Sequence, residues 1–232
     1  MPRKPSTKRR FAGSRFPKTG RTVFSRPRVI PTRTGGFPSV RSRILSLEKK
    51  FVDVAPAAYA ADTTGTVTAL NLTAIGTDFN NRIGRKILMK YVYVTGIIKP
   101  VDTSTVPAYC RVLIVYDNQP NATLAAMTDL LVTANSIDQL NLNNRDRFKV
   151  IADKRYAIGG VSDTATQSFS MSPTVVPVKI FRRLNMETVY GGTTAAIGSV
   201  NTGALLMFTI GDVAANTGGS FALSTRVRFT DT

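Results

Sequence analysis

Lysine and arginine side chains are concentrated at the start of this chain. Residues 1–47 contain thirteen of them and no acid, since the first carboxylate is Glu48, so this segment carries +13. The other 185 residues contain 18 basic and 14 acidic side chains and carry only +4. Such a cluster suits the neutralisation of a polyanion, because each cation placed on a phosphate releases a condensed counterion and adds affinity that ignores base sequence.

We predict that residues 1–47 form a basic N-terminal arm whose thirteen cations contact phosphates. These are Arg3, Lys4, Lys8, Arg9, Arg10, Arg15, Lys18, Arg21, Arg26, Arg28, Arg33, Arg41 and Arg43. Arginine predominates, and its planar guanidinium can fork onto phosphate and stack on bases. Phe11, Phe16 and Phe24 lie among the cations. Their rings either stack on unpaired bases or anchor the arm to the folded part, and the sequence leaves both interpretations open.

The arm also contains six of the twelve prolines in the chain. Prolines at this spacing break any helix, so the segment does not suit a basic amphipathic helix on a membrane surface. High charge with few large apolar residues predicts disorder in the free chain. A tail that only keeps the protein soluble would not need thirteen cations without a single acid.

The first ten residues carry a second pattern. The stretch PRKPSTKRR, residues 2–10, is typical of a nuclear import signal, with Arg3, Lys4, Lys8, Arg9 and Arg10 as its cations. We therefore expect a nuclear import receptor as a partner. No apolar run reaches the length of a membrane helix, and the start lacks the apolar stretch of a secretory signal, so we expect no membrane partner.

The chain lacks the residues that most kinds of catalytic site require. The chain has no histidine and a single cysteine, Cys110, which excludes an internal disulfide, a Ser-His-Asp or Cys-His arrangement and a zinc cluster. A carboxylate hydrolase is the remaining enzyme class, with Asp146 and Asp153 as candidates. Each lies beside Arg or Lys, which favours the ionised form and disfavours a general acid. We interpret both as structural or interface ion pairs and Cys110 as a core residue, and we expect no enzyme, metal site or cofactor.

After residue 47 the composition is that of β-strands, rich in Val, Ile, Thr, Tyr and Phe. We predict eight strands, at residues 48–60, 85–100, 108–120, 147–158, 174–184, 186–192, 203–213 and 221–231. A short helix is expected at 127–132, and Pro177 is expected at a sheet edge or bulge. Eight strands with unequal connections favour an all-β fold, a single eight-stranded jelly-roll sandwich over residues 48–232.

Six further cations within the predicted strands are weaker candidates for an inner basic surface. They are Lys86, Lys90, Arg182, Arg183, Arg226 and Arg228. The alternative is that they lie on solvated strand faces or in interface salt bridges.

Several stretches resemble the capsid proteins of circular, Rep-encoding single-stranded DNA viruses, of the circovirus-like and geminivirus-like kinds. GTDFNNRIGRKILMKYVYVTGIIK (76–99) is similar to their polar-loop-to-strand segment, and AYCRVLIVYDNQP (108–120) to their R-V-hydrophobic-V-Y-D strand. NLNNRDRFKVIADKRYAI (141–158) matches a third segment, and NMETVYGG (185–192) with TGALLMFTIGD (202–212) follows in the expected order. The resemblance spans roughly residues 76–231 behind the arginine-rich arm.

This resemblance implies a capsid protein that self-assembles into an icosahedral homo-oligomer around circular single-stranded DNA. It also implies that the arm points inward and doubles as the nuclear import signal, so that the protein is found in the virion and in the host nucleus during assembly. Two alternatives stay open on charge and fold alone. One is the coat protein of a small single-stranded RNA satellite virus, and the other is a monomeric, non-viral nucleic-acid-binding module.

Overall fold

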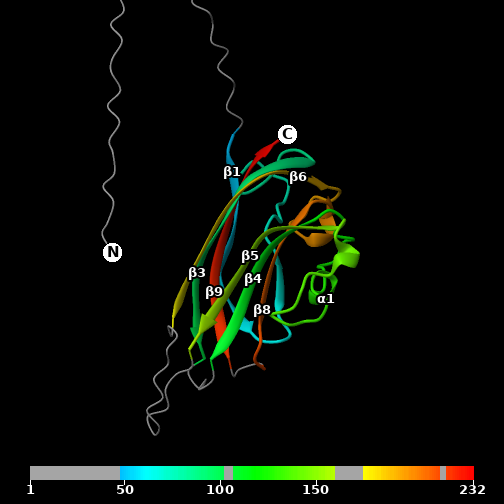
Figure 1. The fold of residues 1–232 in the computed structure, drawn as a ribbon. Helices are drawn as coiled ribbons and strands as arrows, with labels where there is room; N and C mark the ends of the chain where they lie inside the picture. Colours follow the sequence, from blue (N-terminus) through cyan, green and yellow to red (C-terminus); the bar gives the residue numbers. More distant parts are fainter. Residues whose placement is uncertain (1–47, 102–106, 160–174, 215–217) are drawn as a thin grey trace, which may run out of the picture. The chain divides into compact units, whose positions relative to one another are not determined.

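A computed structural model describes residues 48–101, 107–159, 175–214 and 218–232 of the chain (Figure 1). These residues belong to one unit, residues 44–232. The thirteen cations of the predicted arm and the predicted nuclear import signal lie outside the described residues. So do the three phenylalanines Phe11, Phe16 and Phe24, and the predictions made for all of them stay predictions.

The described residues form nine antiparallel strands in two sheets. The five-stranded sheet has the order β1 (Lys50–Ala61), β9 (Gly219–Asp231), β3 (Lys86–Pro100), β6 (Val176–Tyr190) and β7 (Val200–Thr202). The four-stranded sheet has the order β2 (Thr66–Ala69), β8 (Ala204–Gly211), β4 (Ala108–Asp117) and β5 (Phe148–Ile158). The helical turns are short, namely α1 (Met127–Leu130), η1 (Leu142–Asn144) and η2 (Ile197–Ser199). The predicted all-β class is confirmed.

The strand count differs from the predicted eight. The expected strands 174–184 and 186–192 are one continuous strand, β6, because the pairing with β3 continues on both sides of residue 185. Asn185 itself takes a positive φ of 77° at a shift in the register. The four-residue β2 and three-residue β7 were not predicted, since segments this short carry no readable alternation. The short helix was predicted, and its observed extent is Met127–Leu130.

Pro177 lies where β6 is an edge strand. β6 pairs with β3 along most of its length, whereas its pairing with β7 involves only Val189 and Tyr190 among the described residues. The ring of Pro177, which faces Ile97 in the register, therefore costs no hydrogen bond to a second neighbour.

The core lies between the two sheets and also behind the four-stranded one. Strand alternation buries Val92 and Val94 of β3 and Val227 and Phe229 of β9, each fully excluded from solvent. All eight residues of β8 are buried, so both faces of this strand are covered. The connection that carries α1 lies beside β4 and β8 in Figure 1, and it contributes the buried Leu130 and Leu131.

Cys110 is a core residue, as predicted, with 1% of its surface exposed. Burial raises the pKa of its thiol to about 12, with a further contribution from Asp212. Because the pKa is raised, the thiol stays protonated across neutral and mildly alkaline pH in the folded chain, and it ionises near its usual pKa only after unfolding.

We expect the native protein to resist a thiol-specific reagent at mildly alkaline pH, and the guanidinium-unfolded protein to react with one equivalent. Mass spectrometry of the labelled chain measures both states. Rapid labelling of the native protein would contradict the burial of Cys110.

Candidate nucleic-acid interface

Six of the eighteen lysines and arginines among the described residues have a carboxylate partner. The ion pairs between described residues are Lys50–Asp231 (3.1 Å), Lys86–Glu187 (2.9 Å), Arg111–Asp153 (2.7 Å), Arg145–Asp146 (3.9 Å), Arg147–Asp117 (2.9 Å) and Arg226–Asp53 (2.6 Å). The buried Arg82 instead stacks on the ring of Tyr190 at 4.2 Å and donates to the carbonyls of Gly84 and Gly192. These contacts occupy seven of the described cations within the domain.

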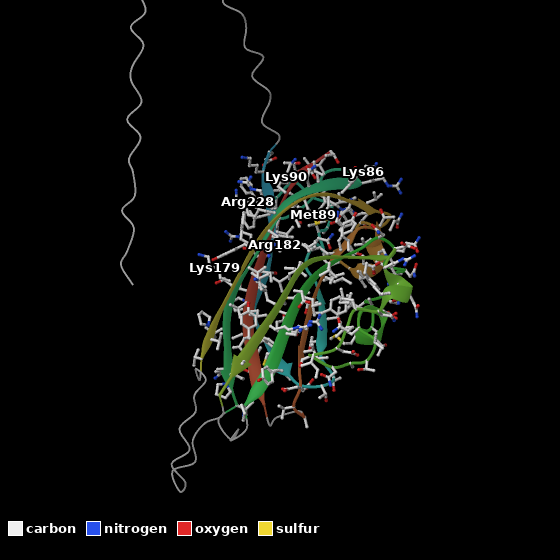
Figure 2. The ribbon with its side chains drawn as sticks, viewed as in Figure 1. Lys86, Met89, Lys90, Lys179, Arg182 and Arg228 are labelled. Carbon is white, nitrogen blue, oxygen red and sulfur yellow. The ribbon has the colours of Figure 1, made fainter. Side chains whose placement is uncertain are left out.

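A second group of cations gathers on the outward face of the five-stranded sheet. Alternation along β9 sends Val227 and Phe229 into the core and therefore turns Arg228 outward. On β6 the same rule buries Val178 and Ile180 and leaves Lys179, Phe181 and Arg183 exposed. Figure 2 shows Lys179 projecting from this sheet, with Lys90 and Arg228 farther up the same sheet.

A β-bulge in β3 brings two consecutive side chains onto this face. Met89 pairs with Phe229 and Tyr91 with Arg228, so Lys90 has no opposite residue on β9. Because the bulge reverses the alternation, Met89 and Val92 are both buried, and Lys90 and Tyr91 both face outward.

The bulge lies beneath a hollow of about 460 Å³, which we call the basic pocket. It is lined by Lys49, Lys90, Tyr91, Phe181, Arg183, Arg228 and Phe229. The rings of Tyr91 and Phe181 lie 5.4 Å apart at 45°, and the guanidinium of Arg228 lies 6.0 Å from the centre of the Tyr91 ring. The pocket therefore combines positive charge with aromatic surface.

The positive charge of the basic pocket is not compensated within the described part of the chain. None of Lys49, Lys90, Arg183 and Arg228 forms an ion pair with a described residue. The buried Nε of Arg228 has no hydrogen-bond partner there either. Four cations without a carboxylate in one hollow suit an anion as their partner.

The structure divides the six cations predicted for an inner basic surface. Lys90, Arg183 and Arg228 line the basic pocket. Lys86 and Arg226 are held in the ion pairs within the chain given above. Arg182 turns toward the other sheet, where its Nε donates to the carbonyl of Ile151 on β5 at 3.3 Å.

Sequence reasoning missed Lys49, Tyr91 and Phe181 as members of this site. Lys49 lies two residues beyond the predicted arm, and alternation along β6 places Phe181 beside Arg183. Tyr91, in contrast, is adjacent to Lys90, and regular alternation would place the two on opposite faces. Only the bulge brings them together.

Both carboxylates considered for catalysis lie within 3.9 Å of an arginine side chain. Asp153 accepts from Nε and Nη2 of Arg111 at 2.9 and 2.7 Å, and the Arg111 side chain is only 2% exposed. Nη1 of Arg111 donates to the carbonyls of Ser136 and Asp138, so this arginine ties β4 to the connection carrying α1. Asp146 is 98% exposed and lies 3.9 Å from Arg145. The interpretation of Asp153 as a structural ion pair is confirmed.

The structure thus defines an all-β sandwich with an uncompensated basic pocket on one outer face. A sequence model of the geminivirus coat protein/nuclear export factor BR1 family matches residues 3–232. The chain therefore belongs to this family, which confirms the resemblance to a coat protein of a circular single-stranded DNA virus. Membership supports a capsid protein, a structural rather than enzymatic role and a place in the virion.

Other comparisons gave weaker matches. No curated protein sequence matches the chain. Similar solved structures include Desmodium yellow mottle tymovirus, at 13% identity and a TM-score of 0.36 over 95% of this chain and 96% of that one. Turnip yellow mosaic virus matches at 12% identity and a TM-score of 0.30, over 81% and 95% of the two chains. The described residues include no helix of sufficient length and apolarity to cross a membrane.

We expect Asp153→Asn to lower the free energy of unfolding by roughly 2–4 kcal/mol, because it leaves the buried Arg111 charge without its counter-ion. Asp146→Asn is the matched control, and its solvent-exposed carboxylate should contribute almost nothing. Urea denaturation followed by circular dichroism measures both variants. Equal stability of the two would contradict the structural role of Asp153.

Proposed function

We propose that this chain is a viral capsid protein that self-assembles into an icosahedral shell around circular single-stranded DNA. Its family membership, residues 3–232, is the observation that carries the proposal. In this proposal the basic arm, residues 1–47, lies inside the shell and neutralises the genome, and residues 48–232 build the wall.

The sheet orders support a jelly-roll wall. Without β7, the two sheets have the orders β1-β9-β3-β6 and β2-β8-β4-β5, four strands each. Strands β1 to β4 alternate between the sheets, and β8 and β9 lie in opposite sheets at the centre of the wall. An eight-stranded jelly roll in two antiparallel sheets fits this pattern, with β7 as a short addition beside the end of β6.

Exposed apolar side chains support burial between subunits. In the connection between β4 and β5, Val132, Ile137 and Leu142 are 58%, 64% and 70% exposed. Contact with neighbouring subunits would bury these side chains, whereas a monomeric nucleic-acid-binding module would leave them in water. This observation favours a coat over the non-viral module. The family match favours DNA over the RNA genome of a satellite virus.

The charge of the arm suits packaging without base readout. Icosahedral symmetry has sixty operations, so the smallest closed shell would confine about 780 arm charges and could neutralise a similar number of phosphates. That many cations in one interior repel one another, so a filled shell is favoured over an empty one at low salt. The cations of residues 2–10 would also bind a nuclear import receptor and bring the protein to the nucleus.

We expect deletion of residues 2–43 to abolish packaging of nucleic acid, because it removes all thirteen cations of the arm. Nuclease protection and sedimentation of purified material measure this. The full chain should sediment as one large, uniform species that protects single-stranded DNA.

The control for this deletion is the far-ultraviolet circular dichroism of the shortened chain, which should remain that of a β protein. Packaging by the shortened chain at the level of the full chain would refute the role of the arm. A full chain that sediments only as a monomer would refute the capsid proposal itself.

A further inference from the structure

We propose that the basic pocket holds one unpaired nucleotide, and that this contact makes the chain prefer single strands over duplexes. The base would lie against Phe181 and Tyr91, and the adjoining phosphates would lie against the four cations of the pocket. This inference rests on the proposed function and deepens it, because it assigns strand selection to the folded domain rather than to the arm.

The charges of the basic pocket call for an anion from outside the described residues. Its lining holds four cations and no carboxylate. A smaller hollow of about 170 Å³ on the same face, lined in part by Tyr93 and Ser224, shows the contrast. There the cation Arg226 is already held by both oxygens of Asp53, at 2.7 and 2.6 Å. In the basic pocket, none of the four cations has a carboxylate partner among the described residues.

The aromatic surface of the pocket indicates that the anionic ligand also carries a flat ring. Phe181 is 48% exposed although phenylalanine has no polar group to solvate. It lies in a β6 stretch between Lys179 and Arg183, and its ring contacts that of Tyr91. Arginine beside an aromatic ring is the combination on which nucleic-acid bases stack. A volume of about 460 Å³ lies within the usual range of small-ligand sites, about 300–1,000 Å³.

Stacking distinguishes single strands from duplexes, and phosphate contacts do not. In a duplex both faces of each base are covered by neighbouring base pairs, whereas an unpaired base has a face free for Phe181. Counterion release by the arm gains at least as much on a duplex as on a single strand, since the salt slope per phosphate is about −0.9 for duplex DNA and −0.7 for single strands. The arm alone therefore gives no preference for the unpaired form.

The test uses the full chain carrying Phe181→Leu, which removes the ring and retains an apolar side chain on an exposed position. Tyr109→Leu is the control, because Tyr109 is a 58% exposed aromatic on β4 of the other sheet. Fluorescence anisotropy measures the affinity for a thymidine oligonucleotide, an abasic strand of equal length and a duplex of equal length, all at one salt concentration.

Phe181→Leu should weaken thymidine-strand binding by about 5- to 100-fold, the usual contribution of one stacked base, and leave the abasic and duplex affinities unchanged. Tyr109→Leu should bind all three probes as the unaltered chain does. An unchanged preference for the thymidine strand in Phe181→Leu overturns the inference. Wild-type binding of all probes with loss of particle assembly also overturns it, since the pocket would then be a contact between subunits.

A second measurement needs no substitution and so does not depend on the folding of a variant. A strand containing 5-iodouracil, photo-cross-linked to the full chain, should yield peptides joined at Tyr91 or Phe181. Cross-links confined to residues 1–47 would overturn the inference while leaving the proposed function intact. Failure of the full chain to bind any of the strands at low salt would instead refute the proposed function.

Discussion

An excess of positive charge over carboxylates, in the first 47 residues and in the basic pocket, is the constraint on which the rest depends. The folded domain satisfies many of its cations internally, as with Arg111 on Asp153, Arg147 on Asp117 and Arg226 on Asp53. The arm contains thirteen cations and no acid, and the basic pocket adds four that form no ion pair with a described residue. In the proposed function a phosphate polymer would pair with both sets, so packaging and folding would draw on different cations of the chain.

The bulge at Lys90 links the architecture to this charge. A regular β3 would turn either Lys90 or Tyr91 into the core. The extra residue lets Met89 and Val92 pack inward while Lys90 and Tyr91 face the same hollow. On the other side of β3, Asn185 takes its positive φ at the same level, so β6 adjusts to the bulge and continues past it. One local irregularity therefore serves both the core and the outer face.

Parts of this arrangement were predictable from the sequence, because they depend on patterns of residues that are close together along the chain. The alternation of apolar residues predicted most strands. The distribution of Lys and Arg along the sequence showed that the positive charge is concentrated in residues 1–47. Pro177 indicated an edge because its missing donor restricts it to one. The predicted break at residue 185 was wrong, because Asn185 takes a positive φ within β6 and the pairing with β3 continues beyond it. The basic pocket depends on the register of three strands, which brings Arg228, Tyr91 and Arg183 side by side, and register over long separations leaves no trace in a single sequence.

The salt dependence of single-strand binding tests the electrostatic account most directly. If the thirteen arm cations and the four cations of the basic pocket all contact phosphates, the logarithm of the binding constant of the full chain should fall with the logarithm of salt concentration at a slope of about −12. Measured between about 50 and 200 mM salt, a slope close to this value would support the account. A flat response, with binding unchanged across that range, would contradict it.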